Sequence, residues 1–277
     1  MSASKPLNLL PELRELNDLF IELIKDLKPE EWQRPTIAGA WVVKDVVAHL
    51  LDGNIRILSM LRDGYYGESP SSESYEGLVA YINRLNADWV QVMRRVSPTM
   101  LILLHELTGP LYHDYYASLD PQAEATFAVA WAGEETSKNW MHVAREYTEK
   151  FLHQQQIRAA TRRPGLMTSK HFRPFAEVCL KALPHTFRDV RAAEGTCVRV
   201  VIPGDSGREW YLQRQSEGWR LVDYTAESPR ATVVIPADAF WQLVSKSKRL
   251  KDLADEITIS GDRAMGEKMA SVVSFMA

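Results

Sequence analysis

The stretch REYTEKFLHQQQIR, residues 145–158, carries a carboxylate and an imidazole one helical turn apart. Glu149 precedes His153 by four positions, and side chains at this spacing lie on one face of a helix, about 5 to 6 Å apart at Cβ. A single metal ion can therefore reach both side chains. Such pairs also occur by chance on solvated helices, so the question is which other residues would complete a site.

Helical periodicity of apolar residues extends over most of the first half of the chain. It covers residues 6–27, 42–64, 75–96, 99–119 and 139–161. The Gly109-Pro110 pair lies inside the fourth segment and predicts a kink or a break there. Residues 120–139 lack a period, and their length and aromatic content make them a candidate pocket wall. The pattern as a whole predicts a bundle of four main helices.

In the second half of the chain the apolar residues alternate with a period of two, which predicts short strands. The predicted strands are residues 196–204, 208–215, 218–224, 231–237 and 256–262. Helices are expected before, between and after them. We therefore predict two domains: a helical bundle over residues 1–168, followed by a smaller α+β domain with an antiparallel sheet over residues 169–277.

The composition excludes several classes of protein. The formal net charge is -3, so no global basic field attracts nucleic acid, and the basic cluster within residues 246–251 is short. The two cysteines, Cys179 and Cys197, form no CxxC motif and fit a reducing compartment. Neither a signal peptide nor an apolar run of membrane-spanning length is recognised. We expect a cytoplasmic protein that binds neither nucleic acid nor membrane.

His49 is a candidate third ligand. It lies in AWVVKDVVAHLL, residues 40–51, beside valines and leucines that must pack inward. An imidazole at such a position is either a core histidine bonded to a carbonyl or carboxylate, or a metal ligand, because an unsatisfied buried polar group costs about 2 kcal/mol or more. Together with Glu149 and His153 it would form a His, Glu, His set with open positions for water or substrate. An open set of three ligands is typical of a catalytic metal.

Three further residues are substrate-binding candidates. His142 precedes Glu149 by seven residues, about 10 Å along a helix, which is too far to share one ion, so we interpret it as a pocket or core residue. Trp131 could stack on a ligand, although bundle core is the commoner position of such a tryptophan. Arg158 could bind a substrate carboxylate or form a salt bridge on the helix surface. No phosphate-binding glycine loop and no GxSxG nucleophile motif is present.

Two motifs resemble a known superfamily. AWVVKDVVAHL resembles the second-helix signature of DinB-like proteins, and EKFLHQQQIR resembles their later ExxxH helix. With a second half that ends in ITISGDRAMGEKMASVVSFMA, the chain is similar over nearly its whole length to the mycothiol-dependent maleylpyruvate isomerase family, whose second domain is related to sterol carrier proteins. The resemblance implies a DinB-like bundle in which His49, Glu149 and His153 hold a divalent metal, zinc or else nickel.

The resemblance also implies an enzyme in which the metal activates a low-molecular-weight thiol for isomerisation or transfer on a small substrate. Relatives with similar sites hydrolyse amides with a metal-bound water, so a hydrolase is a second hypothesis. A non-catalytic carrier of a small molecule or lipid is the third. A homodimer is possible by the same resemblance. The sequence departs from the family at Gln156, where an aspartate is usual.

Overall fold

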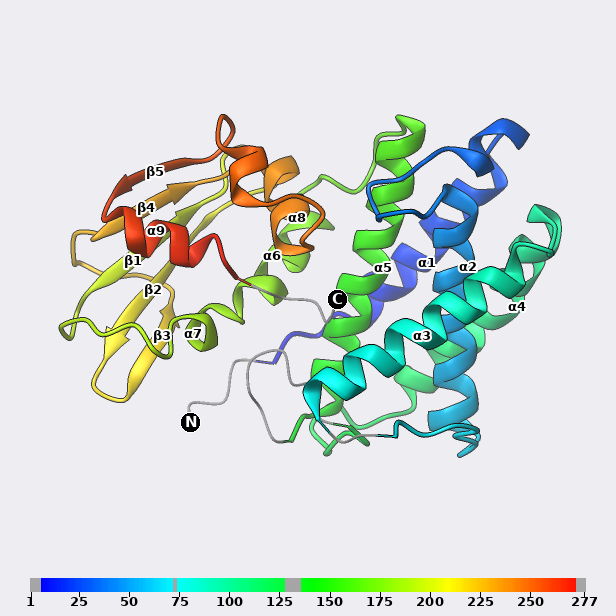
Figure 1. Cartoon of the computed structure of the whole chain (residues 1–277). Helices are drawn as coiled ribbons and strands as arrows, with labels where there is room; N and C mark the ends of the chain where they lie inside the picture. The colour runs from blue at the N-terminus through cyan, green and yellow to red at the C-terminus, as the bar shows by residue number, and fades with distance from the viewer. Residues whose placement is uncertain (1–5, 72–73, 128–135, 273–277) are drawn as a thin grey trace. The chain divides into compact units, whose positions relative to one another are not determined.

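The computed structural model describes residues 6–71, 74–127 and 136–272 (Figure 1). These residues form two compact units. The helical unit contains residues 7–127 and 138–164, and the second unit is built mainly from residues 165–272. No helix in the described ranges is long and apolar enough to cross a membrane.

The helical unit contains five long helices. They are α1 (Leu10–Lys25), α2 (Val43–Ile57), α3 (Tyr75–Met93), α4 (Pro98–Ala117) and α5 (Asn139–Thr161). Helices α1 and α2 each pack against both α4 and α5, and α3 lies against α2. A 3-10 helix, η1 (Pro29–Gln33), precedes α2, and a π-helical turn, η2 (Leu58–Arg62), follows it. The predicted helical bundle is confirmed, although the described residues contain five long helices where four main helices were expected.

A kink or a break was expected at Gly109 and Pro110, and the break does not occur, because helix α4 is continuous through both residues. The residue before the helix, Ser97, is its N-cap, and its side chain accepts a hydrogen bond from the backbone of Met100 at 3.3 Å. Gly109 faces Asn17 of α1, and a Cβ atom at Gly109 would lie 2.7 Å from the Asn17 side-chain oxygen. The glycine therefore permits the close approach of α1 and α4 and does not end the helix.

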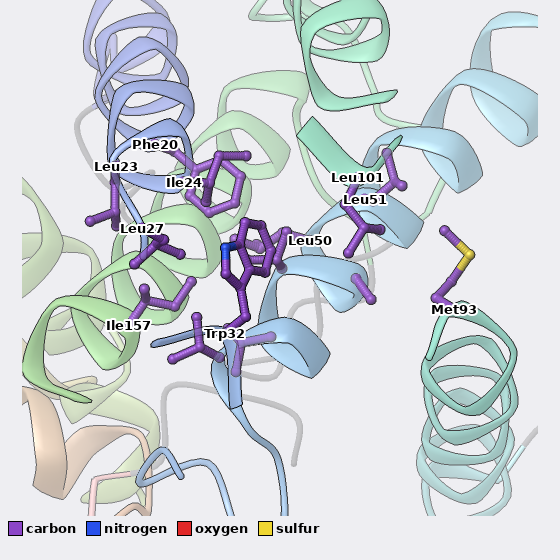
Figure 2. Close-up of a cluster of buried hydrophobic side chains, with 14 residues drawn as sticks. Phe20, Leu23, Ile24, Leu27, Trp32, Leu50, Leu51, Met93, Leu101 and Ile157 are labelled. Atoms are coloured by element: carbon purple, nitrogen blue, oxygen red, sulfur yellow. The ribbon is translucent and has the colours of Figure 1, made fainter. Parts of the chain in front are cut away.

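The core of the helical unit is a cluster of apolar side chains from all five helices and η1 (Figure 2). Trp32 of η1 points toward side chains from α1 and α2 (Figure 2). The labelled members of the cluster are Phe20, Leu23, Ile24, Leu27, Trp32, Leu50, Leu51, Met93, Leu101 and Ile157. Burial of one such side chain stabilises a fold by about 1.5 to 3 kcal/mol, so this cluster holds in place the helices that carry the site.

A buried carboxylate, Glu31, ties the end of α5 to η1. It accepts hydrogen bonds from Arg163 at 2.8 Å and from the backbone of Lys28 at 2.9 Å. Arg163 also donates to the backbone oxygen of Asp26 at 2.8 Å. The hydrogen bond from Arg163, helped by that from Lys28, lowers the pKa of Glu31 to about 2.

The lowered pKa of Glu31 predicts a pH dependence of stability. The folded-state pKa of about 2 lies below the ordinary value of 4.5. The ionised Glu31 side chain therefore stabilises the folded state fully above pH 4.5, and this stabilisation is lost as the pH falls toward 2. In Glu31→Gln we expect a lower free energy of unfolding at neutral pH and a weaker pH dependence between pH 4.5 and 2. Urea unfolding at several pH values measures both, with the exposed neighbour Glu30→Gln as the control. Identical pH profiles of the two variants would contradict the expectation.

The second unit is an α+β fold around a five-stranded sheet. Its strands are β1 (Cys197–Val201), β2 (Glu209–Gln215), β3 (Gly218–Val222), β4 (Ala231–Val234) and β5 (Thr258–Gly261). Its helices are α6 (Phe172–Leu180), α7 (Leu183–Thr186), α8 (Ala237–Val244), η3 (Leu250–Leu253) and α9 (Arg263–Met269). The strand order is β3-β2-β1-β4-β5. The predicted α+β class is confirmed.

The sheet is mixed, whereas a purely antiparallel sheet was expected. The pairs β1–β2, β2–β3 and β4–β5 are antiparallel, but β4 pairs with β1 in parallel, with Val198 opposite Ala231. After β3 the chain returns across the sheet and adds β4 to the free edge of β1 in the same direction. The alternation of apolar and polar residues indicates which face of a strand is buried, but it does not indicate whether the neighbouring strand runs parallel or antiparallel.

Candidate metal centre

His49 of α2 and Glu149 and His153 of α5 lie together in the helical unit. The His49 Nε2 atom is 3.8 Å from one carboxylate oxygen of Glu149, and the His153 Nε2 atom is 3.9 Å from the other. One ligating atom from each of the three residues lies within 4.8 Å of the other two. Ligands of a tetrahedral zinc ion are about 3.3 to 3.5 Å apart, so small side-chain movements would close the set around an ion.

The three side chains differ in their exposure. The side chains of His49 and His153 are 9% and 11% exposed, whereas the side chain of Glu149 is 36% exposed. The two imidazole rings meet edge to face with their centroids 4.6 Å apart, and the Trp41 ring lies 5.0 Å from that of His49. The rings are therefore held by packing, while solvent reaches the carboxylate. A set of three protein ligands leaves a coordination position of a metal open to an exogenous ligand.

The electrostatics of the three residues suit a cation. Burial opposes ionisation of Glu149, but the adjacent His49 imidazole, with His153 and Arg145 nearby, outweighs it and lowers the pKa of Glu149 to about 2. Burial, with His49 close by, lowers the pKa of His153 to about 4. At neutral pH Glu149 is an anion and His153 is neutral, which are the protonation states that a metal ligand requires. The donor set therefore fits a divalent ion.

The two histidines differ in the hydrogen bonding of their Nδ1 atoms. The Nδ1 atom of His153 lies 2.8 Å from the side-chain oxygen of Gln156. The Nδ1 atom of His49 is buried without a hydrogen-bond partner among the described residues. In the sequence, Gln156 stands out only as a departure from the family pattern, and its contact with His153 is not predicted. The spacing of three residues, which places both side chains on one helix face, could have indicated that contact.

A buried lysine lies next to the site and was not predicted. Lys150 donates a hydrogen bond to Asn54 of α2, which in turn donates to Thr108 of α4 at 3.0 Å. Its ammonium group also lies 4.8 Å from the centre of the Tyr112 ring. Burial lowers the pKa of Lys150 to about 8. In sequence a lysine in a polar helical stretch suggests a solvated position, so only the packing shows that Lys150 crosslinks three helices.

A second polar group lies one turn before Glu149. Arg145 forms an ion pair with Glu146 at 2.6 Å, and Glu146 accepts a hydrogen bond from Tyr112 at 2.7 Å. Arg145 precedes Glu149 by four residues, so the two side chains share one face of α5. The same spacing that singled out Glu149 and His153 could have identified Arg145.

The structure locates two of the three substrate-binding candidates. Arg158 donates to the Gln154 side chain at 2.9 Å and to the backbone oxygen of Pro164 at 2.6 Å, so its guanidinium is used inside the helical unit and not in a surface salt bridge. His142 is buried and donates to the backbone oxygen of Phe127 at 2.7 Å, outside the three-ligand group. Trp131 lies outside the described residues.

A family model matches the part of the chain that carries this site. The model of the family described as mycothiol maleylpyruvate isomerase N-terminal domain matches residues 13–158, a range that contains all three candidate ligands. A comparison with curated proteins gave no match.

Solved structures extend the likeness in fold to most of the chain. The mycothiol-dependent maleylpyruvate isomerase aligns with 93% of this chain and 94% of its own, at 13% identity and a TM-score of 0.53. A histidine-to-alanine mutant of that isomerase aligns over the same shares at 12% identity and a TM-score of 0.52. A UbiJ-SCP2 ubiquinone synthesis protein reaches a TM-score of only 0.27 over 38% of this chain and 93% of its own, at 19% identity, so the sterol-carrier relationship stays a prediction. The chain belongs to the mycothiol maleylpyruvate isomerase N-terminal domain family.

Proposed function

We propose that the protein is a metal-dependent enzyme that uses a low-molecular-weight thiol to isomerise a small unsaturated substrate. The observation that carries the proposal is the convergence of His49, Glu149 and His153 within the residues that match the family model. His49, Glu149 and His153 would hold the ion, zinc or nickel. A bound divalent ion favours the thiolate form of a thiol, which is its reactive form.

Residues at and near the candidate metal centre have distinct roles in the proposed enzyme. Glu149 supplies the one negative charge of the ligand set, and its exposed side admits thiol and substrate. Trp41 packs beside the His49 ring and limits the access of water to it. For an anionic group of the substrate we propose Arg145, which shares a helix face with Glu149, in place of Arg158. His142 and Trp131 stay candidates for the pocket.

The proposed reaction needs no external oxidant or reductant. The thiolate sulfur adds to one carbon of a cis double bond that is conjugated to a carbonyl group, and the π electron pair moves onto the carbonyl oxygen. Rotation follows about the resulting single bond. The electron pair then returns from the oxygen, the double bond re-forms in the trans configuration, and the carbon–sulfur bond breaks to release the thiolate. The atoms and electrons of substrate and product are the same.

Cobalt substitution tests whether a thiol binds at the site. With cobalt in place of zinc, addition of mycothiol to the full chain is expected to produce a thiolate-to-cobalt charge-transfer band, and Glu149→Gln is expected to abolish that band. Conversion of maleylpyruvate to its trans isomer should then require both metal and thiol. Absence of the band with mycothiol and with other cellular thiols would contradict the proposal. Products formed equally fast without any thiol would favour the hydrolase instead.

A further inference from the structure

We infer that Gln156 is a positioning residue that selects the tautomer and the orientation of His153. The inference rests on the proposed metal-binding function of the site. Gln156 is 4% exposed, and its side-chain oxygen lies 2.8 Å from the Nδ1 atom of His153. Both side chains are on α5, three residues apart, so the helix itself fixes their separation.

The direction of this hydrogen bond determines which ring nitrogen is free. An amide oxygen only accepts, so the His153 Nδ1 atom carries the proton and donates it. A neutral imidazole then has its lone pair on Nε2. The His153 Nε2 atom is the one that lies 3.9 Å from the Glu149 carboxylate, on the side of the candidate ligand set. Gln156 therefore prepares His153 for a metal before any ion is bound.

The acceptor in this chain is neutral. A carboxylate in the same position would fix the same tautomer and would also raise the basicity of the ligating imidazole. Gln156 orients the ring without adding another negative charge beside Glu149. We therefore expect a lower metal affinity than a carboxylate at position 156 would give.

The neighbouring glutamines provide matched controls. Gln154, Gln155 and Gln156 are all buried on α5. The Gln154 side chain donates to the backbone oxygen of Leu16, and the Gln155 side-chain oxygen has no hydrogen-bond partner among the described residues. Within the described part of the chain, Gln156 is the glutamine of this triplet that hydrogen-bonds to a candidate ligand.

The test compares three variants of the full chain: Gln156→Leu, Gln156→Glu and Gln155→Leu. Zinc affinity is measured by chelator competition, and the tautomer of His153 by the ¹⁵N shifts of its ring in metal-free protein. In Gln156→Leu we expect a loss of about 10- to 100-fold in zinc affinity and loss of the single Nδ1–H tautomer. Gln156→Glu should restore the tautomer and bind zinc more tightly than the wild type. Gln155→Leu should match the wild type in both measurements.

Two results would overturn the inference: an Nε2–H tautomer of His153 in the wild type, or equal zinc affinities of the wild type and Gln156→Leu. A wild-type protein that binds no zinc would instead refute the proposed metal function. The tautomer is measured without metal, so the two failures can be distinguished.

Discussion

Replacing Glu149 by glutamine is expected to reduce zinc affinity by more than about 100-fold. Loss of an outer-shell partner alone costs about 10- to 100-fold, and Glu149 is the only anion of the ligand set. Its amide replacement keeps the size of the side chain but removes the charge. His49→Ala and His153→Ala should cause losses of similar size. Chelator competition on the full-length variants measures the affinities, and circular dichroism checks that each variant is folded.

His142→Gln is the control for these substitutions. His142 is a buried histidine on the same helix, but it donates to the backbone oxygen of Phe127 and lies outside the three-ligand group. Glutamine retains a donor for that bond, and zinc affinity is expected to be unchanged. A loss in this variant as large as that in Glu149→Gln would show that zinc binding depends on the packing of α5 in general.

Leu101→Ala is expected to destabilise the helical unit by about 2 to 5 kcal/mol, because it removes a side chain from the centre of the core. Leu101 on α4 is fully buried, whereas Leu107 on the same helix is 58% exposed. Leu107→Ala should therefore change the free energy of unfolding by no more than about 0.5 kcal/mol. Urea unfolding followed by far-ultraviolet circular dichroism measures both. Equal effects of the two substitutions would mean that the cluster of Figure 2 is not the stabilising core.

Local patterns in the sequence predicted the helices well. The apolar period predicted α3 and α4. The structure shows that Ser74 and Ser97 cap their starts, because a serine side chain satisfies backbone donors that a helix start leaves free. Features that depend on distant segments were not predictable in this way. The parallel pairing of β1 with β4 and the contact of Gly109 with Asn17 join residues far apart in the chain. Neither leaves a local signal.

The candidate ligands were visible in sequence because two of them share a helix face. Which of the histidines occupies the core was not visible. His105 is fully buried and hydrogen-bonds to the backbone oxygen of Val47 at 3.0 Å. It is therefore a core histidine bonded to a carbonyl, which was the alternative interpretation of His49. The Lys150–Asn54 contact depends on how α2 and α5 pack together. Spacing along one helix does not report such contacts.

Anomalous diffraction at the zinc edge tests the proposed metal centre most directly. The crystals should come from the full chain, purified without chelators or a His-tag and supplied with zinc. We predict one strong anomalous peak, from a zinc ion bonded to His49, Glu149 and His153 at about 2.0 to 2.2 Å. A map with no peak between these three residues, or with zinc bound only at other residues, would contradict the proposed metal centre.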